Sequence, residues 1–243
     1  MSTHTVLGQE IHMPVRIRQA RAFMASYRVP AAAAQRLIDY SGLQVIRVPR
    51  DSALCTLVFV EYLDGDLGPY NEFGVSFMVR HHTAEAVGGA ADLRALAAGN
   101  AGVFIHRLPV DGDFTLAAGR GIWGFPKELA DFEVDYTGRV RRGVLRRNGR
   151  LVVDLSVKPG MPTPARRTAG TSFDAYSHID GVTRCTKWDM EPSGMRARIG
   201  GAELTLGEHP WAAELATLGL PTRAPMTSTV DRLTMIFEDA VPV

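Results

Sequence analysis

The chain has 243 residues, a formal net charge of +1, 46% hydrophobic residues and 22% charged residues. This composition is typical of a globular protein with a core, and a net charge near zero argues against nucleic-acid or membrane binding driven by charge alone. No apolar run approaches the roughly 18 residues that cross a bilayer as a helix.

The first residues of the sequence and its two cysteines bear on the cellular compartment of the protein. The first ten residues, MSTHTVLGQE, lack the basic and apolar segments of a secretory signal, and Cys55 and Cys185 match no metal or redox spacing. We therefore expect a cytoplasmic protein. The length allows one large domain or two small ones, and we expect a single domain over residues 1–243.

In the first half of the chain, between Val15 and Val29, five apolar residues recur at even steps, which predicts a strand: Val15, Ile17, Phe23, Ala25 and Tyr27. Residues 1–14 are expected to be a loosely held arm. A short helix should follow Pro30 and end at Gly42. The remaining predicted elements are strands at 44–48, 56–63, 73–81 and 102–110 and a helix at 83–98.

In the second half, the aspartates of residues 111–113 are expected to cap a short helix. The pair Asn148-Gly149 predicts a type I′ turn within a hairpin over residues 139–158. The other expected elements are strands at 129–136, 194–206 and 231–238, a loop at 159–169 and a helix at 210–218. Strands outnumber helices and short connections join them, which predicts an α+β fold dominated by an antiparallel sheet.

One segment, AGRGIWGFPKELAD at residues 118–131, carries the most chemistry. Lys127 lies among Trp123, Phe125, Pro126 and Leu129. Apolar surroundings disfavour the ammonium form of lysine and lower its pKa, and a neutral lysine amine is the group that forms Schiff bases. The alternative is a turn lysine whose ammonium group reaches solvent.

Residues Ala118–Lys127 resemble the active-site signature of the acetoacetate decarboxylase superfamily, A-G-R-x-x-W/Y-G-x-P-K. The resemblance implies that Lys127 forms the Schiff base. It also implies a cone-like, partly closed β-barrel with a few short helices, and an assembly of several identical subunits. Exposed strand edges favour such a homo-oligomer as well.

A second segment, LGPYNEFGVSF at residues 67–77, is similar to the family pattern L-G-x-Y-x-E before a V-S-F strand. In the family the glutamate of this pattern lines the active site, which implies that Glu72 moves protons or holds the substrate. The alternative is an exposed loop acid. The tail at residues 227–239 resembles the C-terminal helix or strand of the family.

The sequence departs from the family pattern at three places. Glu128 replaces the second lysine that follows the catalytic one, and a carboxylate beside Lys127 would raise its pKa. Gly121 replaces an acidic residue. The arginine that binds the substrate carboxylate has no clear counterpart: Arg18 and Arg21 are candidates, we choose Arg21, and Ala20 is the alternative occupant of that position.

Other residues of the signature have two interpretations each. Arg120 would bind a substrate carboxylate or hold the glycine loop through backbone hydrogen bonds. Trp123 and Phe125 would form dry walls of the site or belong to the core. Gly119, Gly121 and Gly124 spell G-x-G-x-x-G, but no strand–turn–helix context supports a dinucleotide site, so we expect these glycines to aim Lys127 inward.

Competing functions have weaker support. The arginines of residues 139–150 could contact phosphates, but alternating arginines are typical of the solvated face of a hairpin, and we expect no nucleic-acid or membrane partner. The seven histidines show no metal-ligand spacing, so no metal is expected.

We therefore predict a Schiff-base lyase acting on a small oxo acid, with Lys127 and Glu72 as its catalytic residues. Decarboxylation of a 3-oxo acid is the first reaction to consider. The alternatives are an aldolase–dehydratase acting on 2-oxo acids and a non-catalytic ligand-binding member of the fold. No cofactor is expected, because the iminium itself accepts the electron pair.

Overall fold

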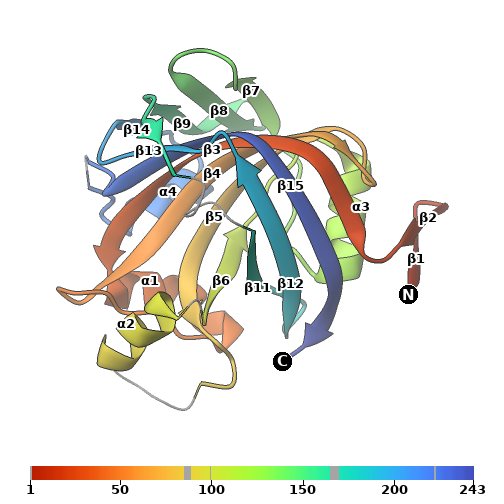
Figure 1. Ribbon diagram of the computed structural model, residues 1–243, viewed down its shortest axis with the longest axis horizontal. Helices are drawn as coiled ribbons and strands as arrows, with labels where there is room; N and C mark the ends of the chain where they lie inside the picture. The colour runs from red at the N-terminus through yellow and green to blue at the C-terminus, as the bar shows by residue number, and fades with distance from the viewer. Residues whose placement is uncertain (1, 85–88, 99, 165–169, 222) are drawn as a thin grey trace.

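The fold is dominated by a β-sheet that closes on itself (Figure 1). A computed structural model of the chain describes residues 2–84, 89–98, 100–164, 170–221 and 223–243. In the large sheet, β3 pairs with β4 on one side and with β15 on the other, which closes a ring of seven strands. The predicted mainly antiparallel barrel with a few short helices is confirmed.

The ring strands follow the order β15, β12, β11, β6, β5, β4, β3. Their bounds are β3 Val15–Pro30, β4 Ser52–Gly65, β5 Tyr70–Arg80, β6 Ala101–Arg107, β11 Thr171–Ile179, β12 Val182–Ser193 and β15 Met226–Pro242. Every pairing in the ring is antiparallel except that of β11 with β6.

Smaller elements surround the ring. A four-stranded sheet has the order β14 (Ala202–Leu206), β9 (Arg150–Val157), β8 (Arg141–Arg147) and β7 (Asp131–Asp135). Short strands β10 (Met161–Pro162) and β13 (Arg196–Arg198) extend the large sheet past β15, and β1 (Thr3–Val6) pairs with β2 (Gln9–His12). The helices are α1 Ala31–Ile38, α2 Gly89–Ala97, α3 Asp113–Trp123 and α4 Pro210–Ala216, with a 3-10 turn at Asp39–Ser41.

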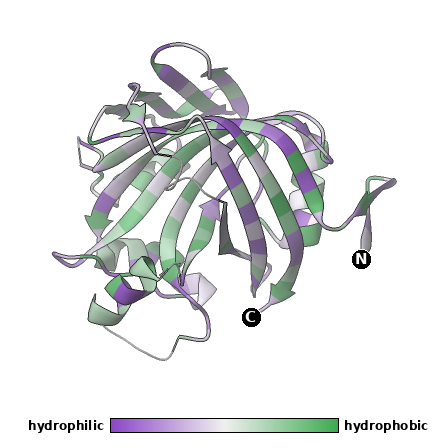
Figure 2. Cartoon of the chain, viewed as in Figure 1, coloured by the Kyte–Doolittle hydropathy of each residue, from purple (hydrophilic) through white to green (hydrophobic). Residues whose placement is uncertain are grey.

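The two faces of the ring differ in their surroundings. On β12, Lys187, Asp189 and Glu191 are exposed, whereas Trp188 and Met190 between them pack against a buried apolar cluster. Because side chains alternate along a strand, the face with Trp188 points into the ring. Figure 2 shows the same alternation of hydrophilic and hydrophobic bands along β12 and β15.

The inner face holds α3 and the loop that follows it. Trp123 donates a hydrogen bond from Nε1 to the carbonyl oxygen of Glu238 on β15 (2.8 Å), and Ser177 on β11 donates to the carbonyl oxygen of Trp123 (2.7 Å). Phe125 lies 5.7 Å from Trp188 on β12, between ring centroids. Contacts to three ring strands fix the end of α3 inside the ring.

The outer face of β3, β4 and β5 is covered by α1 and by the four-stranded sheet. Phe23 and Phe59 stack at 5.3 Å between centroids, and Tyr136 lies 5.5 Å from Phe23. Gly143 on β8 lies so close to the Phe59 ring that an added Cβ would be 2.7 Å from it. The absence of a side chain at Gly143 therefore allows the two sheets to pack.

Several predicted elements are confirmed with shifted ends, and others are wrong. Residues 44–48 form isolated bridges rather than a strand, because Val45 pairs only with Val79 and Val48 only with Ser52. Residues 3–12 are a hairpin rather than a loose arm. The predicted strand at 194–206 is two strands, because Gly200 and Gly201 adopt positive φ values of 69° and 84° between them.

The largest omission is the hairpin of β11 and β12. Asp180 and Gly181 turn the chain between these two strands with φ values of 53° and 74°. Asp-Gly is a type I′ turn signal, so the sequence itself contains the pattern that marks this hairpin. Within the predicted helix at 83–98, Gly89–Ala97 form α2 and Thr83 and Ala84 are not helical, whereas residues 85–88 lie outside the described residues. Part of the predicted loop at 159–169 also lies outside them, and its residues 161–162 form β10.

Two findings bear on the predicted compartment. None of the helices in the described ranges is long and apolar enough to span a membrane. Cys55 and Cys185 are buried free thiols.

Candidate active site

The C-terminal end of α3 directs the chain back along the helix. Gly124 adopts φ 64°, and its N–H donates to the carbonyl oxygen of Arg120 (3.2 Å). The N–H of Phe125 donates to the carbonyl oxygen of Gly119 (3.0 Å). The bond from Gly124 is that of the αL cap, in which a left-handed residue ends a helix and its N–H binds the carbonyl oxygen four residues earlier. The reversed chain brings Lys127 beside the helix.

Gly119 makes room for the lysine side chain. A Cβ added at Gly119 would lie 2.5 Å from Cδ of Lys127, whereas one added at Gly121 would meet nothing within 4 Å. Gly119 and Gly121 lie inside α3 and Gly124 ends it. The three glycines therefore end a helix instead of opening one, which does not fit a dinucleotide fingerprint.

The amine of Lys127 is buried in a polar pocket, and the residue is 3% exposed. Its Nζ lies 2.9 Å from Oε2 of Glu72 on β5 and donates to Oγ1 of Thr115 on α3 (2.8 Å). Nζ also lies 4.8 Å from the centre of the Tyr70 ring. The structure thus brings together Lys127 and Glu72, which lie far apart in the sequence.

Glu72 is held from its other side. Tyr62 donates its hydroxyl to Oε1 of Glu72 (2.8 Å), and Glu72 is 4% exposed. The rings of Tyr62 and Tyr70 stack at 4.1 Å between centroids with 13° between their planes. Burial and the nearby Glu72 carboxylate keep the pKa of Tyr62 well above its usual value, so this phenol remains a hydrogen-bond donor.

Two opposing effects act on Lys127. Burial lowers the pKa of its amine, and the Glu72 carboxylate raises it by charge attraction and a hydrogen bond; the net direction is downward. Loss of solvent stabilises the neutral amine relative to the ammonium. Glu72 is in position to accept the proton that the amine must lose before it can attack a carbonyl group.

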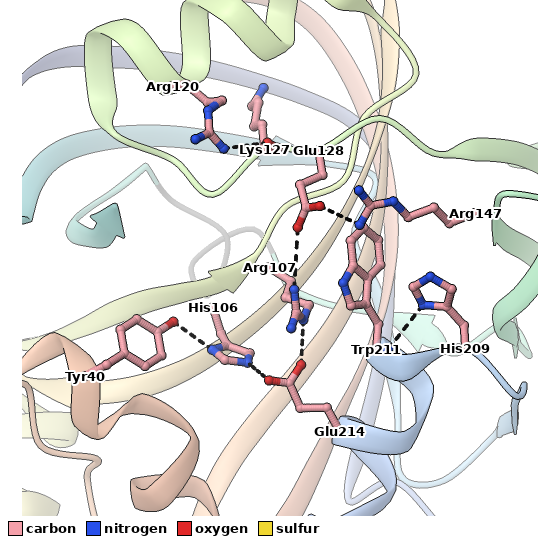
Figure 3. Close-up of polar contacts among 10 residues, drawn as sticks. All are labelled: Tyr40, His106, Arg107, Arg120, Lys127, Glu128, Arg147, His209, Trp211 and Glu214. Atoms are coloured by element: carbon pink, nitrogen blue, oxygen red, sulfur yellow. Dashed lines mark hydrogen bonds and ion pairs between the residues drawn. The ribbon is translucent and has the colours of Figure 1, made fainter. Parts of the chain in front are cut away.

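Glu128 faces away from this pocket. Its Oε2 lies 2.5 Å from Nη1 of Arg147 on β8, and its Oε1 lies 3.6 Å from Nη1 of Arg107 on β6. Figure 3 shows the side chains of Lys127 and Glu128 leaving the loop in opposite directions. The acid that acts on the pKa of Lys127 is therefore Glu72, which corrects the predicted role of Glu128.

The arginines around Glu128 belong to a wider network on the outer face (Figure 3). Arg107 also donates to Glu214 on α4 (2.6 Å), and Nε2 of His106 lies 3.0 Å from the same carboxylate. Burial raises the pKa of Glu214, but hydrogen bonds from His106 and Arg107 outweigh it and hold the pKa at about 2. This network fixes the outer side of the loop that carries Lys127.

The remaining predicted residues lie around the pocket or away from it. Arg120 is exposed and donates to the carbonyl oxygen of Lys127 (3.2 Å), which matches the backbone role weighed for it. Trp123 and Phe125 are buried in the inner core. Arg21 pairs with Glu61 and lies 5.5 Å from the centre of the Tyr136 ring. Arg21 therefore points to the outer face, because it lies two residues before Phe23 on β3, and the structure does not bring it to Lys127.

Sequence reasoning missed Thr115, Tyr62 and Tyr70. Tyr70 lies two residues before Glu72 on the same strand, so alternation could have placed it on the same face. Tyr62 could not be found without the register of β4 against β5, which sets it opposite Tyr70. In the described residues, no group of three or more His, Cys, Asp or Glu side chains is arranged to hold a metal ion.

Comparisons with known proteins agree with this arrangement. The sequence model of the family described as acetoacetate decarboxylase (ADC) matches residues 3–241. A curated protein named "Acetoacetate decarboxylase 3", from Mesorhizobium japonicum, is 40% identical over 47 residues, 19% of this chain and 18% of that protein. The matched stretch thus spans less than a fifth of that relative.

Solved structures share the fold at low sequence identity. The crystal structure of acetoacetate decarboxylase from Legionella pneumophila has a TM-score of 0.67 at 18% identity and covers 95% of this chain and 87% of that one. The enduracididine biosynthesis enzyme MppR, complexed with the condensation product of pyruvate and imidazole 4-carboxaldehyde, has a TM-score of 0.63 at 15% identity, with coverage of 96% and 90%. At these identities the likeness concerns the fold alone.

Proposed function

Because the chain belongs to the acetoacetate decarboxylase family, we propose that it is a Schiff-base lyase acting on a small oxo acid, and that decarboxylation of a 3-oxo acid is its reaction. The observation that carries the proposal is the buried Lys127 amine, 2.9 Å from the Glu72 carboxylate and 3% exposed. A desolvated amine with a proton acceptor at hydrogen-bond distance is prepared for attack on a carbonyl group.

In the first step, Glu72 takes a proton from the Lys127 ammonium. The free amine adds to the ketone carbon of the substrate and forms a carbinolamine. Protonation of its hydroxyl group and loss of water then give a protonated imine, with nitrogen bonded to the former ketone carbon. Thr115, which accepts a hydrogen bond from Nζ at 2.8 Å, would orient the amine during this step.

In the second step, the bond between the carboxylate carbon and C2 breaks and carbon dioxide leaves. The bond's electron pair moves into the new carbon–carbon double bond, and the iminium nitrogen becomes the neutral nitrogen of an enamine. Protonation of the enamine at carbon and hydrolysis of the imine release the ketone and restore Lys127. Glu72, which Tyr62 holds by a hydrogen bond of 2.8 Å, would return the proton.

An aldolase–dehydratase acting on a 2-oxo acid is the second candidate. It uses the same Lys127 imine, but this imine becomes an enamine by losing a proton from C3 to Glu72 instead of losing carbon dioxide. The enamine carbon then bonds to the carbonyl carbon of an aldehyde, whose oxygen takes up a proton. The observation in its favour is the likeness of fold to a protein that holds a condensation product of pyruvate.

The two reactions are separated by their products. Acetoacetate in H₂¹⁸O should yield carbon dioxide together with acetone that carries ¹⁸O beyond its spontaneous exchange, because hydrolysis of the imine inserts a solvent oxygen. Pyruvate mixed with an aldehyde should yield a dehydrated adduct only in the second case. Lys127→Arg, which keeps a positive charge but cannot supply a neutral amine, should abolish either activity. Product formation by this variant at the wild-type rate would contradict both proposals.

A further inference from the structure

The inner face of the ring continues beyond Glu72 as a strip of small and hydroxyl-bearing residues. The pairing register places Gly74, Val58, Met24 and Ser228 side by side across four strands, and Ser76, Thr56 and Ser26 side by side in the following row. Directly paired residues share a face, and Glu72 lies on the same face one row earlier, opposite Val60. We call these seven residues the inner strip.

The inner strip is accessible to solvent from inside the ring. Five of its members are half-buried: Met24, Ser26, Thr56, Val58 and Ser76. Their neighbours on the outer face of the same strands, such as Ala25, Cys55 and Phe77, are 0% exposed. Because the outer face is covered at these positions, the exposure of the strip must come from the interior.

The opposite direction from Lys127 is closed. Tyr62 and Tyr70 occupy the row before Glu72 and are 3% and 7% exposed, and Thr115 contacts Nζ of Lys127 from α3. A molecule bonded to the amine therefore has the inner strip as its direction of extension.

The chemistry of the strip is uncharged but not purely apolar. None of its seven residues is acidic or basic. Ser26 and Thr56 hydrogen-bond to each other at 2.9 Å. The Ser228 hydroxyl, in contrast, is buried without a hydrogen-bond partner, and the residue is 1% exposed. Ser228 therefore marks the closed side of the strip, and the half-buried residues form its open part.

We infer that the inner strip binds the distal part of the substrate: an uncharged chain of roughly five to eight atoms beyond the reacting carbonyl. The upper limit on length comes from the four residue steps from Glu72 to Ser76, about 13 Å in a strand, which a chain of eight atoms does not exceed. The inference rests on the proposed function for the position of the reacting carbonyl. It makes acetoacetate the shortest member of the substrate class and not the preferred one.

The test uses unreactive analogues, so that binding does not depend on imine formation. Calorimetry would compare 3-hydroxybutanoate with 3-hydroxyoctanoate, which differ by four methylene groups. Each fully buried methylene raises affinity about fourfold, so four methylenes set an upper limit of about 250-fold. Because the strip covers the chain on one side, we expect the longer acid to bind about tenfold more tightly or better. Val58→Phe should abolish this gain and leave 3-hydroxybutanoate binding unchanged. Thr234→Phe, on the outer face of β15, should keep the gain.

Equal affinity of the wild type for the four- and eight-carbon acids would overturn the inference. If the eight-carbon acid binds more tightly but no imine forms on Lys127, the proposed function is rejected and the inner strip remains a binding site.

Discussion

Replacing Glu72 with glutamine removes the carboxylate that contacts the Lys127 amine and leaves the shape of the side chain almost unchanged. The charge of Glu72 lies 2.9 Å from Nζ and raises the pKa of Lys127, whereas burial lowers it. Glu72→Gln should therefore lower the pKa of Lys127 further. A nearby opposite charge commonly shifts a pKa by about one to three units, or about 1.4–4 kcal/mol.

The assay is the pH dependence of Lys127 reactivity. The rate of borohydride-dependent inactivation by a saturating oxo acid should rise with pH as the amine loses its proton, and the midpoint of this rise reports the pKa of Lys127. In Glu72→Gln the midpoint should move to lower pH by about one to three units. Turnover should nevertheless fall by about 10²-fold or more, because the proton acceptor is lost.

Glu61→Gln is the matched control for this experiment. Glu61 lies beside Val60 on the neighbouring strand but pairs with Arg21 on the outer face, so its replacement should leave the midpoint unchanged. A midpoint that stays constant or rises in Glu72→Gln would refute the reasoning, because the carboxylate would then not stabilise the ammonium.

Three further predictions concern the surroundings of Lys127. Gly119→Ala should lower the rate of borohydride-dependent inactivation at least about tenfold, because its Cβ would lie 2.5 Å from Cδ of Lys127. Gly121→Ala is the control, because it has open space at its Cβ and gains similar helix propensity. Equal rates in the two variants would count against the packing argument. Glu128→Gln should cost about 0.5–1 kcal/mol in urea unfolding through loss of its partly exposed pair with Arg147 and leave the reactivity midpoint of Lys127 in place; a lowered midpoint would mean that Glu128 does act on the amine. The pKa of Glu214 is lowered from 4.5 to about 2, so its carboxylate stabilises the fold above pH 4.5 and this contribution is lost as pH falls toward 2. In the wild type the free energy of unfolding should therefore fall between pH 4.5 and pH 2, and in Glu214→Gln this fall should be smaller by about 2 kcal/mol. An identical pH profile in the two proteins would contradict the prediction.

The sequence predicted the proximity of Lys127 and Glu72 better than it predicted the residues around them. Lys127 and Glu72 each lie in a local segment with a readable pattern, and the structure sets them 2.9 Å apart. Arg21 also lies in a readable strand, but a one-residue irregularity in the pairing of β3 near Gln19 and Ala20 decides which face it takes. A shift of one residue moves a side chain to the other face of a sheet, and no local pattern reveals it.

The same limit applied to longer segments. The hairpin of β8 and β9 was predicted because Asn148-Gly149 lies between two clear strands, and these residues adopt φ values of 51° and 72°. The strand predicted at 44–48 is absent because a strand needs a neighbouring strand to pair with along its length, and local apolar content does not indicate whether one is present. Thr115 was missed because its contact with Lys127 arises only when the chain reverses direction at Gly124, after α3 ends.

The central claim is that Lys127 forms a covalent imine with an oxo acid, and reduction with sodium borohydride tests it most directly. The protein would be mixed with acetoacetate, reduced, digested and examined by mass spectrometry. The predicted result is a reduced adduct on Lys127. The adduct should be absent from the Lys127→Arg variant and from samples without the oxo acid. Folded protein that carries no adduct on Lys127 with acetoacetate, with longer 3-oxo acids or with pyruvate would contradict the account.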